Sequence, residues 1–458
     1  MTVAPADLLT GPDWQHRIDA LAAKHGVPGV QVGLLALDGD DADVRVLGSG
    51  VTSTSTGVPV TPRTVFHYGS ITKVWTTTLV LQLVDDGLLT LDTPVTEVLP
   101  GFATAVPGHA ERITVRHLLT HTAGIDGDVF TDTGDGDDCV AKYVDALAGA
   151  VSITEPGGPF SYANSGFVVA GRIVEVLRGQ VWDDVLAERL LRPLGLTHVI
   201  TRFRDAPLHR AAVGHHTDPD TGVATATTRW HLPRSIGPAG IAVGDSADLL
   251  AFLAAHLRGG VGLTGERVLS EESALLMRRE HVDLSALSTT TSGWGLGWMR
   301  SDWGADTAVH HNGGTIGQIA ESHSFPGLGL ALCVLTNSDR GTALADELEA
   351  EIAAEFGLTP PKPTAGPDAA EADLSALAGV YETPALRCVL DRTPEGGLTI
   401  SLAEKTVIAG AAPMTGAVTP LAANRFAFDR AGAVREFAHL VHEGREYLYA
   451  GRLFARVG

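Results

Sequence analysis

The sequence predicts a chain of two parts: helices packed on one mixed sheet, followed by a small antiparallel β-barrel. Strand-like runs near the N-terminus are followed by helical segments, then by further strands and a last helix, an order typical of one sheet covered by helices. The segment GLTPPKPTAGP has the composition of a linker, and short β-rich runs recur after it, as in a small barrel. We therefore expect domains at 1–358 and 368–458, joined by a linker at 359–367.

Composition limits the class of protein. The chain has 458 residues, 44% of them apolar, which is ample material for more than one core. Its net charge of 33 − 54 = −21 argues against a nucleic acid or an anionic membrane as partner. The three cysteines, Cys139, Cys333 and Cys388, are widely spaced, so we expect neither a disulfide framework nor a thiolate zinc site. Cys333 lies in the apolar run LGLALCVLTN and is expected in the core.

The N-terminus lacks a basic segment followed by an apolar one, so no secretory signal is expected. No apolar run reaches the ~20 residues that span a bilayer. The sequence therefore predicts a cytoplasmic protein without a membrane segment.

The elements of the first half follow from hydrophobic periodicity and turn residues. Residues 12–25 predict an amphipathic helix, and GVQVGLLALDG with VRVLGSGV predicts a hairpin. The segment around Ser70 continues as a helix to Gly87, LLTLDTPV reads as a loop, and ITVRHLLTHTAGI predicts a short helix that ends at Gly124. DGDVFTDTGDGDD is expected to be a solvated loop, because it lacks the spacing of a calcium-binding EF-hand.

The second half of the larger domain alternates in the same way. Residues 160–210 predict mainly helix, while GWGLGWMR, AVHHNGG and LGLALCVLTNSD predict strands. A helix over LADELEAEIAAEF completes the domain. Beyond the linker, runs such as RCVLDR, GLTISL and REYLYAG predict the strands of the barrel.

The stretch HYGSITKVWTT places Ser70 three residues before Lys73, the only Lys, Arg, Asp or Glu between Thr64 and Val84. Residues three apart on a helix share a face, so the two side chains are neighbours if Ser70 opens the helix. The unpaired N–H groups of a first turn favour negative charge there. Burial lowers the pKa of a lysine until it can act as a base. The pattern predicts an activated serine nucleophile.

Two further motifs follow in order. PFSYANSGFVVAG carries Tyr162 and Asn164, and AVHHNGGTIGQ carries His311, Asn312 and two glycines. Together with S-I-T-K they resemble the three motifs of the penicillin-binding-protein and class C β-lactamase family of serine acyl enzymes. TVRHLLTHTAGI, RPLGLTHV, GPAGIAVGDSADLLAFL and GWGLGW also resemble segments of that family. The resemblance covers roughly residues 15–355 and implies an antiparallel sheet flanked by helices plus an all-helical lobe.

The resemblance also implies roles for the motif residues. Ser70 attacks the acyl carbonyl, and Lys73 takes its proton or shares it with Tyr162. The nearby cation lowers the pKa of Tyr162, which relays a proton to the leaving group. Asn164 orients Lys73 and binds a substrate amide. His311 stands where many relatives carry a lysine, and it would replace that cation in supporting Tyr162 or a substrate carboxylate.

The third motif also supplies backbone groups and substrate contacts. By the same resemblance, the backbone N–H groups of Ser70 and Gly314 form the oxyanion hole. Asn312 and Gly313 are expected to bind substrate, and the paired glycines allow the close approach that this needs.

No metal and no cofactor are expected. His310 and His311 are adjacent on a predicted strand, so their side chains point to opposite faces. His117 and His121 are four apart, as zinc ligands can be, but the glutamate of H-E-x-x-H is missing. Trp294 and Trp298 of GWGLGW are expected to wall the site or to lie in the core.

The layout as a whole resembles the stand-alone penicillin-binding-protein-type thioesterases of nonribosomal peptide assembly, which carry a C-terminal lipocalin-like barrel. That resemblance implies release of a peptidyl thioester from a carrier protein and its head-to-tail macrocyclisation. A cytosolic esterase or a D-stereospecific peptidase remains an alternative, and a β-lactamase or a non-catalytic binding module is a further one. We expect the barrel to wall the substrate cleft or to dock a carrier protein.

Overall fold

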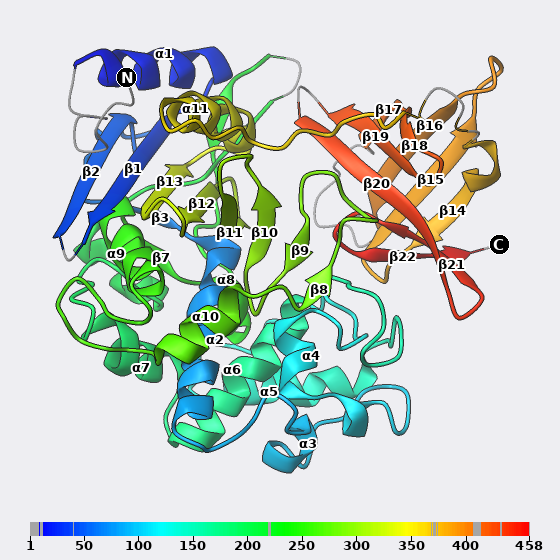
Figure 1. Ribbon diagram of the computed structural model, residues 1–458, viewed down its shortest axis with the longest axis horizontal. Coiled ribbons are helices and arrows are strands. Elements are labelled where there is room, and N and C mark those ends of the chain that lie inside the picture. The colour runs from blue at the N-terminus through cyan, green and yellow to red at the C-terminus, as the bar shows by residue number, and fades with distance from the viewer. Residues whose placement is uncertain are drawn as a thin grey trace.

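The computed structural model describes residues 9, 12–39, 41–218, 221–367, 369, 372, 374–405, 414–430 and 433–457. Figure 1 shows a larger part of helices and sheet beside a smaller β-rich part made by the C-terminal strands. Among the described residues, no helix is long and apolar enough to cross a membrane.

The larger part is built on an antiparallel sheet of eight strands among the described residues, in the order β2-β1-β13-β12-β11-β10-β9-β8. The sheet is thus antiparallel, as the family resemblance implies, and not mixed. Its strands are β1 (Gly29–Asp38), β2 (Asp41–Gly50), β8 (Val282–Asp283), β9 (Gly293–Trp294), β10 (Met299–Asp302), β11 (Thr307–Gly314), β12 (Ile319–Phe325) and β13 (Leu330–Thr336). Short strands form two smaller sheets: β3 (Thr64–His67), β4 (Arg210–Ala211) and β7 (Val243–Gly244), and β5 (His215–Thr217) with β6 (Ala224–Ala226).

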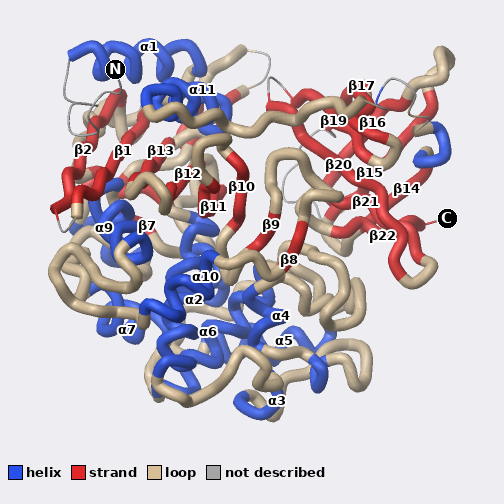
Figure 2. Tube along the Cα trace, in the orientation of Figure 1, coloured by secondary structure: helices blue, strands red, loops and turns tan. Residues whose placement is uncertain are grey.

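Helices cover both faces of this sheet and form a lobe below it, which Figure 2 shows as a gathering of blue helices. They are α1 (Pro12–His25), α2 (Thr72–Asp85), α3 (Val95–Val98), α4 (Val115–Leu119), α5 (Cys139–Ala146), α6 (Asn164–Arg178), α7 (Trp182–Leu186), α8 (Gly237–Gly240), α9 (Ser246–Leu257), α10 (Glu271–Arg278) and α11 (Gly341–Glu355).

Alternation along β1 explains the layers. Val30, Val32 and Leu34 pack against α1 and α11 in one cluster, while the residues between them face α9. At Gly33 an added Cβ would lie 2.8 Å from Leu250 Cδ1, so only glycine lets α9 approach this closely.

Helix α2 runs through the middle of the larger core. Its residues are buried almost without interruption from Thr72 to Leu83, and Trp75 stacks on Phe252 of α9 at a ring distance of 3.8 Å. A helix that is apolar all round belongs inside a protein. The prediction that Lys73 sits in a buried helix is therefore confirmed.

The C-terminal part is a nearly closed barrel, in the strand order β17-β16-β15-β14-β22-β21-β20-β19-β18. Its core is filled by side chains such as Tyr381, Phe426 and Phe437. The strands are β14 (Gly379–Glu382), β15 (Leu386–Arg392), β16 (Leu398–Glu404), β17 (Met414–Ala417), β18 (Thr419–Ala422), β19 (Arg425–Arg430), β20 (Ala433–His442), β21 (Arg445–Tyr449) and β22 (Leu453–Val457).

The barrel shares a hydrophobic cluster with the larger part. Phe160, Leu284 and Trp294 pack against Tyr449 and Leu453 of the barrel. The cluster joins the two parts next to the site described below.

Several predicted elements need correction. Strand β12 was not predicted, because its sequence IAESHSF is largely polar although six of its seven residues are buried. Helix α4 ends at Leu119, five residues before Gly124. Residues 160–210 contain α6 and α7 but break into a π turn and a 3-10 turn after them. The cysteines Cys139, Cys333 and Cys388 are all free and buried, and Cys333 lies in the core as predicted.

Candidate active site

Ser70 lies in a 3-10 turn, Gly69–Ile71, that leads directly into α2. The serine therefore precedes the helix rather than opening it, and Lys73 lies in the first turn of α2. The predicted proximity still holds, because Lys73 Nζ is 3.0 Å from Ser70 Oγ. The turn thus presents the hydroxyl and the amine to each other.

Lys73 is enclosed by three oxygen atoms. Its Nζ donates to Asn164 Oδ1 (2.7 Å) and to the carbonyl of Ala239 (2.6 Å), and Ser70 Oγ is the third neighbour. The side chain is fully buried. Burial lowers the pKa of Lys73 well below its ordinary value, and the positive charge of Arg452 lowers it further.

The neutral amine fits this arrangement. With one proton removed, Lys73 keeps two N–H groups for Asn164 and Ala239, and its lone pair faces the Ser70 hydroxyl. That is the geometry of a general base and its nucleophile.

Tyr162 stands beside the same amine. Its ring centroid is 4.9 Å from Lys73 Nζ and 5.1 Å from Arg452 Cζ. The expectation that a nearby cation lowers the pKa of Tyr162 is wrong in sign. Burial raises the pKa of Tyr162 and outweighs its hydrogen bond with Ser70 and the charge of Arg452. Tyr162 is thus a neutral hydroxyl that can pass a proton.

His311 is buried in β11, and its Nδ1 lies 2.6 Å from the carbonyl of Asn312. A carbonyl only accepts, so Nδ1 carries the hydrogen and Nε2 carries the lone pair. Burial, with Lys73 nearby, lowers the pKa of His311 to about 3. The expectation that His311 replaces a lysine cation is therefore wrong.

Nε2 of His311 has no hydrogen-bond partner among the described residues. This buried acceptor is available to an O–H or N–H group of Tyr162 or of a substrate. His310 points away from it and stacks on His323 with ring centroids 4.7 Å apart, as the alternation along a strand predicts.

The third-motif glycines touch the nucleophile's backbone. A Cβ on Gly313 would lie 1.9 Å from the Tyr68 carbonyl oxygen and 2.9 Å from Ser70 N. Gly69 is equally crowded, because a Cβ added to Gly69 would lie 3.0 Å from Gly314 N. The strand can lie against the turn only because these positions lack side chains, and the two predicted oxyanion donors, Ser70 N and Gly314 N, come to one place.

Two further residues, Asp128 and Arg452, join the site without having been predicted as site residues. Asn164 Nδ2 donates to Asp128 Oδ1 (3.2 Å), and Arg452 Nη2 donates to the same oxygen (2.7 Å). Asp128 belongs to the acidic segment predicted to be a solvated loop, yet its side chain is only 9% exposed. Lys73, Asn164, Asp128 and Arg452 therefore form one continuous polar chain.

Arg452 belongs to the barrel and lies in the turn between β21 and β22. Tyr162 N donates to the Gly451 carbonyl (2.9 Å), and Leu453 N donates to Ser161 Oγ (3.2 Å). These backbone contacts fasten the turn to the second motif on both sides of Arg452.

His121 is a third residue whose position was not predicted. It has a positive φ of 56°, its Nδ1 accepts from Ala163 N (2.9 Å), and its ring lies 4.3 Å from that of Tyr162. Burial, with Lys73 close by, lowers its pKa well below the ordinary value. His121 thus supports Tyr162 as a neutral ring, while His117 caps α4 together with Thr114.

Ser70 opens into a cavity of about 820 Å³ between the larger part and the barrel. Asn164, Asn312 and Gly313 line it, and Trp294 forms part of its wall while Trp298 lies in the core. Both tryptophans are therefore placed as predicted. The barrel contributes side chains that include Leu386, Leu402, Phe437, Tyr449, Arg452 and Phe454, so the expectation that it walls the cleft is confirmed.

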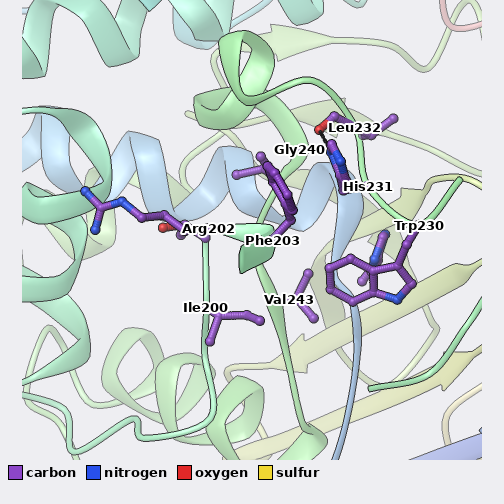
Figure 3. A pocket seen from close by; sticks show the side chains of 11 residues that line it. Ile200, Arg202, Phe203, Trp230, His231, Leu232, Gly240 and Val243 are labelled. Carbon is purple, nitrogen blue, oxygen red and sulfur yellow. Dashed lines mark hydrogen bonds between the residues drawn. The ribbon is translucent and has the colours of Figure 1, made fainter. Parts of the chain in front are cut away.

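A smaller pocket adjoins the cavity at Leu232 and Gly240, which line both. Figure 3 shows Trp230, Phe203 and His231 around it. Its volume of about 10 Å³ is room for one water molecule, and the Nε2 atom of His67 at its edge has no partner among the described residues.

Among the described residues, one group of side chains has the spacing of metal ligands: His198, Asp245 and Asp248. None of the three lines the cavity. Asp245 already caps α9 through the N–H of Asp248 and pairs with Arg63.

The family model described as Beta-lactamase matches residues 14–355 of the chain. Penicillin-binding protein 4 of Amycolatopsis lactamdurans is 42% identical over 372 residues, which cover 81% of this chain and 97% of that protein. The unguisins hydrolase ungD' of Aspergillus campestris (strain IBT 28561) is 27% identical over 339 residues, covering 70% of this chain and 61% of that one.

Among solved structures, SurE matches with a TM-score of 0.76 at 27% identity and covers 99% of both chains. SurE with D-Leu matches over the same shares with a TM-score of 0.74. The similarity therefore extends through the larger part and the barrel together.

Proposed function

The chain belongs to the beta-lactamase/penicillin-binding-protein family of serine hydrolases, and from this premise we propose that it is a peptidyl thioesterase and cyclase. In this proposal Ser70 takes a peptidyl group from a thioester, held on a carrier protein, and the free amine of the same peptide releases it as a head-to-tail ring.

The observation that carries the proposal is the cavity around Ser70, closed on one side by the barrel. Phe130, Phe160, Trp294, Phe437 and Tyr449 line it with apolar and aromatic surface. A cavity of this size suits a folded peptide more than a small ester. An amine held in the same space as the acyl group reacts at a high effective concentration, so it competes with water.

The first step forms the acyl-enzyme. Lys73 removes the proton of Ser70, whose Oγ attacks the thioester carbonyl, and the C–S bond breaks. The proton reaches the leaving thiolate through Tyr162. Backbone N–H groups of Ser70 and Gly314 stabilise the oxyanion, a contribution of about 3 kcal/mol per donor.

The second step reverses these transfers. The peptide's own amine attacks the acyl ester, a C–N bond forms, and the C–Oγ bond breaks. A proton from the nitrogen returns to Ser70 Oγ through Lys73 and Tyr162. The proton transfers of both steps therefore use only side chains of this protein and the substrate itself.

SurE supports a D-configured acyl donor, because it resembles this chain over its full length and is known in a complex with D-Leu. We therefore propose that the residue whose carbonyl is attached to Ser70 has the D configuration.

The test is to incubate the protein with a linear peptidyl thioester that ends in D-Leu and to analyse the products by mass spectrometry. The proposal predicts a product lighter than the linear acid by one water, and a lower yield of it from the L-Leu thioester. Formation of linear acid alone, from either substrate, would contradict cyclisation.

A hydrolase is the second candidate, since one relative is named as the unguisins hydrolase. In that case water takes the place of the amine at the same acyl-enzyme, and the natural substrate is an ester or a D-residue amide. Rapid hydrolysis of D-Leu p-nitroanilide, with no cyclic product from the thioester, would favour this candidate.

A further inference from the structure

We propose that Glu321 forms a subsite for a primary ammonium group in the cavity that contains Ser70. This inference rests on the proposed function, in which the substrate is a peptide with a free amine. It adds a specificity residue outside the three motifs.

The sheet register places Glu321 close to the nucleophile. Glu321 on β12 pairs with Asn312 on β11, and the next residue of β11 is Gly313, which touches the backbone at Ser70. A strand spacing of about 4.8 Å and a rise of about 3.3 Å put the Cα atoms of Glu321 and Gly313 roughly 6 Å apart. Glu321 and Asn312 share one face of the sheet, and both line the cavity that contains Ser70.

The carboxyl of Glu321 has no partner among the residues that the structure describes. The residue is 8% exposed and lines the cavity. No described residue donates a hydrogen bond to it or forms an ion pair with it. Neither carboxyl oxygen is among the fully enclosed polar atoms, so both keep accessible surface. A buried carboxyl without a partner is unfavourable, and the cavity is where its partner can come from.

A second acid in the same cavity shows the contrast. Glu436 also lines it, but its carboxylate accepts from Thr289 N (2.9 Å) and Ser288 Oγ (2.9 Å). Glu436 is thus satisfied within the protein, whereas Glu321 is not.

The surroundings of Glu321 favour a cation as that partner. Burial raises the pKa of Glu321 well above its ordinary value, and Glu349 and Asp346 of α11 raise it further. The imidazole of His323, on the same strand, lies 3.3 Å from Glu349, and burial lowers its pKa to about 4, so it supplies no positive charge at neutral pH. An ammonium group would stabilise the ionised form of the Glu321 carboxyl and donate up to three hydrogen bonds.

The subsite would hold the amino end of a peptide inside the cavity while its carboxyl end is attached to Ser70. It would thereby favour substrates with a free amine over those with a blocked one. A primary ammonium on a side chain has the same chemistry, and the experiment separates it from the terminal amine.

The test measures binding without turnover. The Ser70→Ala protein is titrated with a linear peptide acid that ends in D-Leu, carries no lysine or ornithine, and is either free or acetylated at its N-terminus. We expect the free form to bind about tenfold more tightly, and Glu321→Gln in the same background to abolish the difference. A third peptide, acetylated but containing one lysine, reports on the side-chain ammonium.

Glu349→Gln is the matched control, because Glu349 belongs to the same buried acidic group but does not line the cavity. It should keep the preference for the free amine. Equal binding of the free and acetylated peptides, no binding of either, or an equal loss in both glutamate variants would overturn the proposal. The wild type could make only linear acid from the thioester while the Ser70→Ala protein still prefers the free amine. That result would contradict cyclisation and support the ammonium subsite.

Discussion

At the scale of single residues, the site depends on how burial shifts the pKa values of Lys73, Tyr162 and His311. The sequence shows Lys73 as a lone charge in an apolar segment, and together with the two later motifs this predicts a base. It does not show what surrounds Tyr162 and His311, whose neighbours come from distant segments. The predicted charge states of those two residues were therefore wrong, since burial keeps the phenol protonated and the imidazole neutral.

The residue scale gives a pH prediction. Because neutral Lys73 is the base, kcat/KM for thiol release should rise as pH increases through the lowered pKa of Lys73 and then level off. His311, with a pKa of about 3, should add no further limb between pH 5 and 8. Stopped-flow thiol release across this range measures the profile.

Two variants test the assignment. Lys73→Arg keeps a positive charge that cannot be lost, so the rate should fall by about 10²- to 10⁴-fold. His311→Gln should lower the plateau value of kcat/KM without changing the pH at which half of that plateau is reached. A midpoint that moves with His311, or a Lys73→Arg protein of normal rate, would show that the base lies elsewhere.

At the scale of elements, the β21–β22 turn is the part of the site that the sequence did not reveal. The Arg452–Asp128 contact joins residues 324 positions apart, and neither residue lies in a recognisable motif. Strand β12 was missed for a related reason. One of its polar residues, Ser322, is satisfied only in the folded sheet, where its Oγ donates to the His311 carbonyl.

The turn gives a prediction of its own. In Arg452→Ala, Asp128 loses its partner while it remains buried and bonded to Asn164. A hydrogen bond between charged groups contributes about 1.5–3 kcal/mol. Because this one holds Asp128 against Asn164, and Asn164 holds Lys73, kcat/KM should fall by roughly 10- to 100-fold. Steady-state kinetics with a peptidyl thioester checks this.

A double-mutant cycle separates positioning from packing. Asp128→Asn combined with Arg452→Ala removes the unpaired charge, and the double variant should recover part of the lost rate. Strictly additive losses would mean that Arg452 acts through direct substrate contact and not through Asp128 and Asn164.

At the scale of the whole molecule, the order of strands and helices was enough to predict a helix-covered sheet followed by a barrel. Periodicity reports which side of each element is buried, and three ordered motifs fixed the family resemblance. The shared cluster of Phe160, Trp294 and Tyr449 could not be predicted, because apolar residues that join two parts look like those of either core. The cavity is lined by residues of both parts, so it could not be predicted either.

The barrel in this account is a wall and not a container. Its interior is filled by side chains, with the rings of Phe426 and Phe437 stacked 5.3 Å apart. It contributes Tyr449 and Arg452 to the cavity lining, together with residues of its own core such as Leu402 and Phe437. The substrate is therefore enclosed by both parts of the molecule at once.

The central claim is that Ser70 carries the acyl group within this enclosure. Intact-protein mass spectrometry after brief mixing with a D-Leu-terminated peptidyl thioester tests it most directly. The account predicts a mass increase equal to one peptidyl group on the 458-residue chain and none on a folded Ser70→Ala variant. Acylation of the Ser70→Ala protein, or turnover that it retains in full, would contradict the mechanism.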